Sequence, residues 1–182
     1  MSNVVQQAEV WVWLDLEMTG LEPKEDKILE ASCILTTKHL REYTTVPFSE
    51  VISQPENVLT SMSEWCIEHH GESGLTQACL NSKKDLSMVE NELIAYIQEH
   101  TLPTDTLYLA GNSIHMDRAF IKEHMKGLDS LLHYRMIDVT SIGIVCSTVG
   151  IEPFEKEAPH RALDDIRLSI AELKHYLAGL QK

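Results

Sequence analysis

The sequence of 182 residues predicts an α/β fold in which helices cover a mixed β-sheet. Runs of β-branched and aromatic residues dominate the first part of the chain, which favours consecutive strands in an antiparallel meander. From about residue 60 the apolar residues follow helical spacing, and shorter strand-like runs then alternate with helices. Strands that first follow one another and later alternate with helices imply both antiparallel and parallel pairing in one sheet.

The expected strands are short apolar runs bounded by turn residues or by helical segments. They comprise residues 10–16, 28–36, 42–48, 106–111 and 134–138. Thr19 and Gly20 provide the turn after the first of them. The first run, VWVWLDL, is apolar at nearly every position, as expected of a strand that is covered on both faces.

The expected helices are segments in which apolar residues recur every three or four positions. They include residues 63–67, 86–97, 113–126, 138–148 and 161–178. The second carries a stripe of Leu86, Val89, Leu93 and Ile97, and the last carries Leu163, Ile166, Ile170, Leu173 and Leu177. Asp138 stands where a strand gives way to a helix, which favours a helix N-cap.

Composition indicates one soluble globular domain over residues 1–182, with 43% hydrophobic and 24% charged residues. These fractions exclude a disordered or fibrous chain. No apolar run approaches the roughly 18–20 residues that cross a bilayer, so we expect no membrane span. The first residues resemble neither a secretory nor an organellar leader, so a cytoplasmic location is expected; a mitochondrial location from an alternative start is left open.

Charge and cysteine content narrow the classes of function. The net charge of −13 argues against a protein that holds long nucleic acid on a broad cationic surface, but it leaves room for a small phosphate ligand. Cys33, Cys66, Cys79 and Cys146 have neither metal-ligand spacing nor the density of a disulfide scaffold. They are interpreted as reduced, mostly buried thiols.

Asp15 and Glu17 stand at the end of the first strand. Residues two apart in a strand project from the same face, so both carboxylates are aimed together. On these two residues alone, a polar face that points to solvent is the favoured explanation. The apolar residues before them favour a covered strand instead, where an acid is costly unless it is paired or bound to a cation.

Asp117 occupies a core-facing position on the helix expected over residues 113–126. At 100° per residue it lies within about 40° of Ile121, on the apolar stripe with Ile114 and Met125. A pairing with Arg118 is the alternative explanation, but adjacent residues do not face each other on a helix. A functional acid is therefore favoured.

His160, Asp164 and Asp165 open the last helix. Either acid would complement the positive N-terminus of the helix, and a lone histidine is most often structural. Helical geometry does not decide which aspartate points into a site.

Four segments together resemble the oligoribonucleases, a branch of the DEDDh 3′-to-5′ exonucleases with a ribonuclease-H-like fold. They are WLDLEMTGL (13–21), GNSIHMDRAFI (111–121), YRMIDVTSI (134–142) and HRALDDIRLSIAELKHY (160–176). The resemblance implies that Asp15, Glu17, Asp117 and Asp165 are metal ligands and that His160 is the general base, since the family spacing H-x4-D selects Asp165. Four converging acids would repel one another without divalent cations, and all-oxygen ligands suit two Mg²⁺ or Mn²⁺ ions.

The resemblance also implies a substrate pocket. Leu21 and Trp65 match residues that flank the bases, although each also has a plain core explanation. Ser113, Arg135 and Thr140 match a cap around the 5′ phosphate, with Thr140 in place of the usual serine. Tyr134 and His70 match residues that approach from the partner subunit of a homodimer. A surface cation is the simpler explanation for Arg135, and a helix N-cap for Ser113.

The predicted function is a metal-dependent 3′-to-5′ exoribonuclease that degrades RNA of two to about five nucleotides to nucleoside 5′-monophosphates, with dinucleotides preferred. One alternative is a DEDDh exonuclease that trims longer RNA or DNA. Another is a non-catalytic nucleotide-binding scaffold, which the intact set of acids and His160 disfavours.

Overall fold

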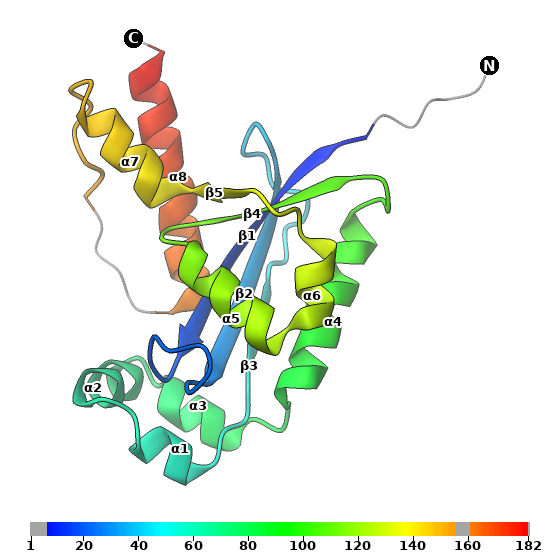
Figure 1. Ribbon diagram of the computed structural model, residues 1–182, viewed down its shortest axis with the longest axis vertical. Coiled ribbons are helices and arrows are strands. Elements are labelled where there is room, and N and C mark those ends of the chain that lie inside the picture. Colours follow the sequence, from blue (N-terminus) through cyan, green and yellow to red (C-terminus); the bar gives the residue numbers. More distant parts are fainter. Residues whose placement is uncertain (1–6, 156–160, 182) are drawn as a thin grey trace.

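The computed structural model describes residues 7–155 and 161–181. In this part of the chain one mixed sheet has the strand order β3-β2-β1-β4-β5 (Figure 1). The strands are β1 (Glu9–Met18), β2 (Ile28–Thr37), β3 (Phe48–Val51), β4 (Thr106–Gly111) and β5 (Met136–Asp138). β1, β2 and β3 form an antiparallel meander, whereas β4 pairs parallel with both β1 and β5. The predicted mixed sheet is confirmed.

The helices follow the strands as the change of periodicity predicts. They are α1 (Glu56–Thr60), α2 (Glu64–Glu72), α3 (Leu75–Asn81), α4 (Leu86–His100), α5 (His115–His124), α6 (Lys126–Leu131), α7 (Val139–Ser147) and α8 (Ala162–Leu180). Side-chain caps begin three of them, because Ser63, Asp85 and Asp138 each accept a backbone N–H from the first turn. The predicted capping role of Asp138 is confirmed.

β1 is buried on both faces. Because successive side chains of a strand point to opposite faces, the position of a residue in β1 determines which helices it contacts. Val10, Val12, Leu14 and Leu16 share a core cluster with residues of α4, α5 and α6. Trp13, on the other face, shares a cluster with residues of α7 and α8. Figure 1 shows these two groups of helices on opposite sides of the strands, with α1, α2 and α3 at one end. By the same alternation, Asp15 and Glu17 belong to the α8 face.

Two expected elements differ in the structure. The third strand covers Phe48–Val51 rather than 42–48, because Pro47 has no N–H to donate and residue 42 forms only an isolated bridge. The expected helix 113–126 is divided at Met125, whose φ and ψ of −126° and 63° are not helical. Glu90 of α4 then accepts the backbone N–H of Leu128, which satisfies a donor in the first turn of α6.

The predicted apolar face of the last helix is only partly correct. Ile166, Ile170 and Leu173 are buried, but Leu177 is exposed and Tyr176 is buried beside them. Two short helices, α1 and α3, were not expected; Leu59, Leu75 and Cys79 of these helices pack in a small separate cluster with Leu29 of β2.

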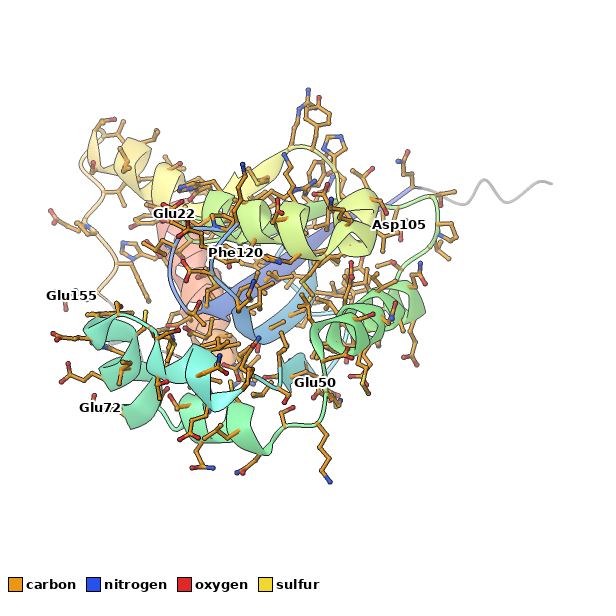
Figure 2. The ribbon with its side chains drawn as sticks, turned by 60° about the horizontal axis from the view of Figure 1, so that its bottom comes forward. Glu22, Glu50, Glu72, Asp105, Phe120 and Glu155 are labelled. Carbon is orange, nitrogen blue, oxygen red and sulfur yellow. The ribbon has the colours of Figure 1, made fainter. Side chains whose placement is uncertain are left out.

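All four cysteines are free and buried, as expected. Among the described residues, no helix has the length and apolar character needed to cross a membrane. Of the acidic side chains labelled in Figure 2, Glu72 at the end of α2 and Asp105 in the loop before β4 lie at opposite edges of the molecule.

Candidate active site

The carboxylates of Asp15, Glu17 and Asp165 converge at the end of β1. Each offers an oxygen, and these three oxygens lie within 4.8 Å of one another. Asp15 and Glu17 project toward α8 because they alternate with Leu14 and Leu16, which face the opposite core. Asp165 stands in the first turn of α8, and the adjacent Asp164 is half exposed beside Arg167. Sequence geometry left the choice between these two aspartates open, and the structure brings Asp165 to the strand.

Asp117 approaches the same strand from α5. Its side chain is 6% exposed, and Oδ1 accepts the backbone N–H of Leu16 at 3.0 Å, between the two acids of β1. Gly111 permits this approach, because a Cβ there would lie 3.0 Å from the Leu14 carbonyl oxygen and 2.8 Å from Ile114. Arg118 instead pairs with Asp129, with Nε 2.8 Å from Oδ1. The alternative in which Asp117 is neutralised by its neighbour is therefore wrong.

Crowding of acids dominates the electrostatics of the site. Burial, followed by the charges of Asp117 and Glu17, raises the pKa of Asp15 well above its usual range. Burial and the charge of Asp165 raise the pKa of Glu17 to about 8. Burial also raises the pKa of Asp117 to about 7, against the opposing effect of the hydrogen bond from Leu16. Ionised together, these groups repel one another, so a cation between them would be strongly favoured.

The donor set fits divalent metal ions. Carboxylate oxygens suit Mg²⁺ or Mn²⁺, whereas zinc prefers histidine and cysteine ligands. In the described residues, the group of side chains with metal-ligand geometry consists of Asp15, Glu17 and Asp165 alone, with Asp117 adjacent to it. The structure thus supports divalent metal use.

An ion pair between a buried carboxylate and a partly exposed guanidinium, which the sequence did not reveal, holds α8 against the sheet. Glu30 is the neighbour of Glu17 across β1 and β2 and is 1% exposed. Its carboxylate accepts from Arg161 Nη2 at 2.6 Å and from Nε at 3.1 Å, and also from the backbone N–H of Ala162. The available signal was an acid inside the apolar run ILEASCIL, but its partner lies 131 residues away.

An apolar pocket opens beside Glu17. Its volume is about 660 Å³. The lining residues are Leu16, Glu17, Met18, Gly20, Leu21, Ser63, Trp65, Cys66 and His70. Leu21 and Trp65 are 68% and 55% exposed, so the structure does not support a plain core explanation for either side chain. Two exposed apolar side chains on one pocket beside the acids suit a nucleobase.

The residues expected to cap the 5′ phosphate come from the loop before α5 (Ser113), the loop before β5 (Arg135) and the first turn of α7 (Thr140). Ser113 and Thr140 are in contact, with Oγ and Oγ1 3.3 Å apart. Ile114, and not Ser113, is the N-cap of α5, so the capping explanation for Ser113 is wrong. Arg135 is exposed, and its guanidinium lies 5.1 Å from the ring centroid of Tyr134.

The sequence profile of the RNase_T exonuclease family matches residues 12–173. Mitochondrial oligoribonuclease of Mus musculus is 43% identical over 179 residues, which are 96% of this chain and 75% of the mouse protein. The oligoribonuclease of Colwellia psychrerythraea is 46% identical over 168 residues, covering 91% and 92% of the two chains. This chain belongs to the oligoribonuclease family of exonucleases.

Membership of this family confirms the resemblance predicted from four motifs and the predicted class of enzyme, a 3′-to-5′ exoribonuclease. Exonuclease I of E. coli, solved with an oligonucleotide, aligns over 95% of this chain with a TM-score of 0.71 and 14% identity. Exonuclease I of Methylocaldum szegediense aligns over 95% with a TM-score of 0.65 and 18% identity. This chain spans less than half of either exonuclease I chain, and the likeness supports the predicted ribonuclease-H-like fold.

The roles expected of all the site residues remain predictions, including those of the two histidines. His160 lies outside the described residues, directly before the anchored Arg161. His70 is 2% exposed in its own chain, where Nε2 lies 3.0 Å from the Met18 carbonyl oxygen at the edge of the pocket.

Proposed function

We propose that this oligoribonuclease-family protein hydrolyses very short RNA, dinucleotides above all, and releases nucleoside 5′-monophosphates from the 3′ end. The convergence of acids from β1, α5 and α8 beside an apolar pocket carries this proposal. The pocket has room for few bases, and the net charge of −13 disfavours long polyanions. One exonuclease domain over residues 1–182 suffices for this chemistry.

Asp15, Glu17, Asp117 and Asp165 would hold two divalent cations, Mg²⁺ or Mn²⁺. Bound there, the ions would neutralise the scissile phosphate, activate the attacking water and stabilise the leaving 3′ oxygen. The contribution of the chain is a rigid frame. β1 is buried on both faces, Asp117 is fixed by the N–H of Leu16, and α8 is fixed to β2 through Glu30.

His160 would act as the general base. A neutral imidazole accepts the proton of the attacking water near pH 7. Its neighbour Arg161 is held by Glu30, which fixes the chain at the residue after the base. The hydrolysis rate should therefore fall on acidification, and a rate that stays constant from about pH 9 to pH 5.5 would remove His160 from this role.

Leu21 and Trp65 would hold the bases against the metal site. Both are exposed on the pocket beside Glu17, and base stacking on an aromatic ring is worth about 1–3 kcal/mol. Ser113, Thr140 and Arg135 would grip the 5′ phosphate at the far end. Hydroxyls and a guanidinium bind a terminal phosphate well and leave no path for a longer chain.

A homodimer would complete this cap. Tyr134 of the partner subunit would approach the substrate. His70, which the resemblance expects to approach from the partner subunit as well, is 2% exposed and lines the pocket of its own chain, so we propose that it acts on that pocket. An exposed apolar surface supports a contact with a second copy, because Ile144 and Val145 of α7 and Val149, which follows this helix, are 63–65% exposed. Sedimentation equilibrium tests this: a dimer is expected for wild type, a monomer for Val145→Asp, and a monomeric wild type would contradict the proposal.

We place the protein in the cytoplasm. The alternative, a mitochondrion, is the location in the name of the mouse relative. Fractionation of the cells that express it decides between the two.

Time courses on 5′-labelled RNAs of two to seven nucleotides with Mg²⁺ test the substrate proposal. The dinucleotide should be cleaved fastest, and EDTA should stop cleavage. A 10-mer that is cleaved faster than the dinucleotide would favour the alternative exonuclease of longer chains. Full hydrolysis by Asp15→Ala would show that another nuclease was measured.

A further inference from the structure

A buried hydrogen-bond network joins α8 to Ser113 and Thr140. Glu172 of α8 is 7% exposed, and its Oε2 accepts from Asn112 Nδ2 at 2.8 Å. The same Nδ2 donates to Thr140 Oγ1 at 3.2 Å. Thr140 Oγ1 in turn accepts the backbone N–H of Ser113 at 3.0 Å. The network therefore runs from α8 through the loop after β4 to the first turn of α7.

The backbone of Ser113 is strained, and this network holds the strain. Its φ is 46°, in the left-handed region that is unfavourable for a residue with a Cβ atom. Such a conformation persists only where the surroundings determine it, and it is concentrated at functional sites. Here the Ser113 N–H has two acceptors, Thr140 Oγ1 and Asp138 Oδ1 at 3.2 Å.

The network also includes two polar groups that are buried in the protein, the Glu172 carboxylate and the Asn112 amide oxygen. Glu172 is an acid inside the α8 packing, where it also accepts from the Tyr176 hydroxyl at 3.0 Å. Asn112 Oδ1 is buried without a hydrogen-bond partner among the residues that the structure describes. A buried unpaired acceptor destabilises the folded protein, because it loses its hydrogen bonds to water. An apolar residue at either position would avoid these costs, so packing alone does not explain the pair.

Helix α8 connects this network with the metal site. Asp165 and Glu172 are seven residues apart, so they lie on nearly the same face of the helix. Two turns of a helix separate them by about 10 Å along its axis. One rigid element thus carries an acid of the metal cluster and the acid that anchors the loop before Ser113.

We infer that Glu172 and Asn112 are positioning residues that fix the 5′-phosphate cap at a set distance from the metal site and so determine the preference for very short RNA. This inference rests on the proposed cap of Ser113, Thr140 and Arg135. Asn112 orients the Thr140 hydroxyl and, through it, the strained Ser113. Glu172 fixes the position of the Asn112 amide relative to Asp165, which lies on the same helix.

The test compares KM for one dinucleotide with and without a 5′ phosphate. Wild type should prefer the phosphorylated form by about tenfold, the worth of one good charge-assisted contact. Glu172→Leu and Asn112→Ala should bring this ratio close to one, with the loss in KM rather than kcat. Glu172→Gln retains an acceptor for Asn112 and should restore the ratio.

Tyr176→Phe is the matched control. It removes the hydrogen bond from the Tyr176 hydroxyl to Glu172 and the acceptor of the Phe154 N–H, and it leaves the contact between Glu172 and Asn112 intact. The ratio should therefore stay at the wild-type value while thermal stability falls. Equal loss of the ratio in Tyr176→Phe would show a general structural role and overturn the inference.

The remaining outcomes separate the inference from the cap. A wild-type preference that persists in Asn112→Ala and Glu172→Leu overturns the inference and leaves the cap in place. A wild type without preference for the 5′ phosphate overturns the cap and the inference with it. Because Asn112 is only partly buried, Asn112→Ala provides the answer even if Glu172→Leu does not fold.

Discussion

Replacing Arg161 with methionine should destabilise the protein much more than replacing its partner Glu30 with glutamine. The two side chains differ in their access to water, since the Glu30 side chain is 1% exposed and that of Arg161 is 36% exposed. Two hydrogen bonds of 2.6 and 3.1 Å join them, and Glu30 lies opposite Glu17 in the sheet. Each substitution keeps the approximate volume of the original side chain.

The asymmetry follows from the charge that is left behind. Arg161→Met leaves a buried carboxylate without its cation, next to Glu17, at a cost of about 3–5 kcal/mol. Glu30→Gln leaves a guanidinium that can reach water and an amide oxygen that still accepts, so its cost is about 1 kcal/mol. Removing the charge of Glu30 also relieves Glu17, whose pKa it helps to raise.

Urea denaturation in EDTA measures both costs. The free energy of unfolding should fall by at least about 2 kcal/mol more for Arg161→Met than for Glu30→Gln. The double variant should be more stable than Arg161→Met, because no unpaired carboxylate remains. A Glu30→Gln variant that is as unstable as Arg161→Met, or more so, would refute this reasoning.

The acid cluster and the pocket give three more predictions. Asp15→Asn should raise the melting temperature of the metal-free protein, because one of the repelling charges is removed. The same substitution should lower the rate of hydrolysis by at least about 10³-fold. A melting temperature in EDTA below that of wild type would contradict the expected stabilisation. In EDTA, stability should fall as pH rises from about 4 to about 8, because Glu17 and Asp117 bind protons more tightly folded than unfolded; pH-dependent calorimetry checks this, and a rise would be the wrong sign. Trp65→Ala should raise KM for a dinucleotide about tenfold, because a base would lose its stacking partner. The melting temperature should change little, since the ring is 55% exposed. A KM equal to that of wild type in steady-state kinetics would exclude base stacking on this side chain.

Local periodicity predicted the parts of the site that depend on a single element. Alternation along β1 placed Asp15 and Glu17 on one face, and the apolar stripe of α5 placed Asp117 on the buried side. Both arguments use only the geometry of a regular strand or helix. For the same reason the boundaries of β4, at residues 106 and 111, agree with the predicted strand.

Contacts between distant segments could not be predicted in this way. In the sequence, Glu30 is a single acid in an apolar strand. Its partner Arg161 lies 131 residues away, and only the fold brings the two side chains together. The choice between Asp164 and Asp165 depends on how α8 packs against β1, which the helix alone does not decide. α3 was not expected because Leu75 and Cys79 pack in a small cluster of their own rather than along a long stripe.

Isothermal titration calorimetry with Mn²⁺ at about pH 8 tests most directly whether the cluster of Asp15, Glu17 and Asp165 is a metal site. Wild type should bind Mn²⁺, and Asp165→Asn should weaken binding by at least about tenfold. Asp164→Asn is the matched control, because its side chain is half exposed outside the cluster and its affinity should equal that of wild type. Unchanged affinity in Asp165→Asn, or equal loss in Asp164→Asn, would contradict the assignment of the cluster as the metal site.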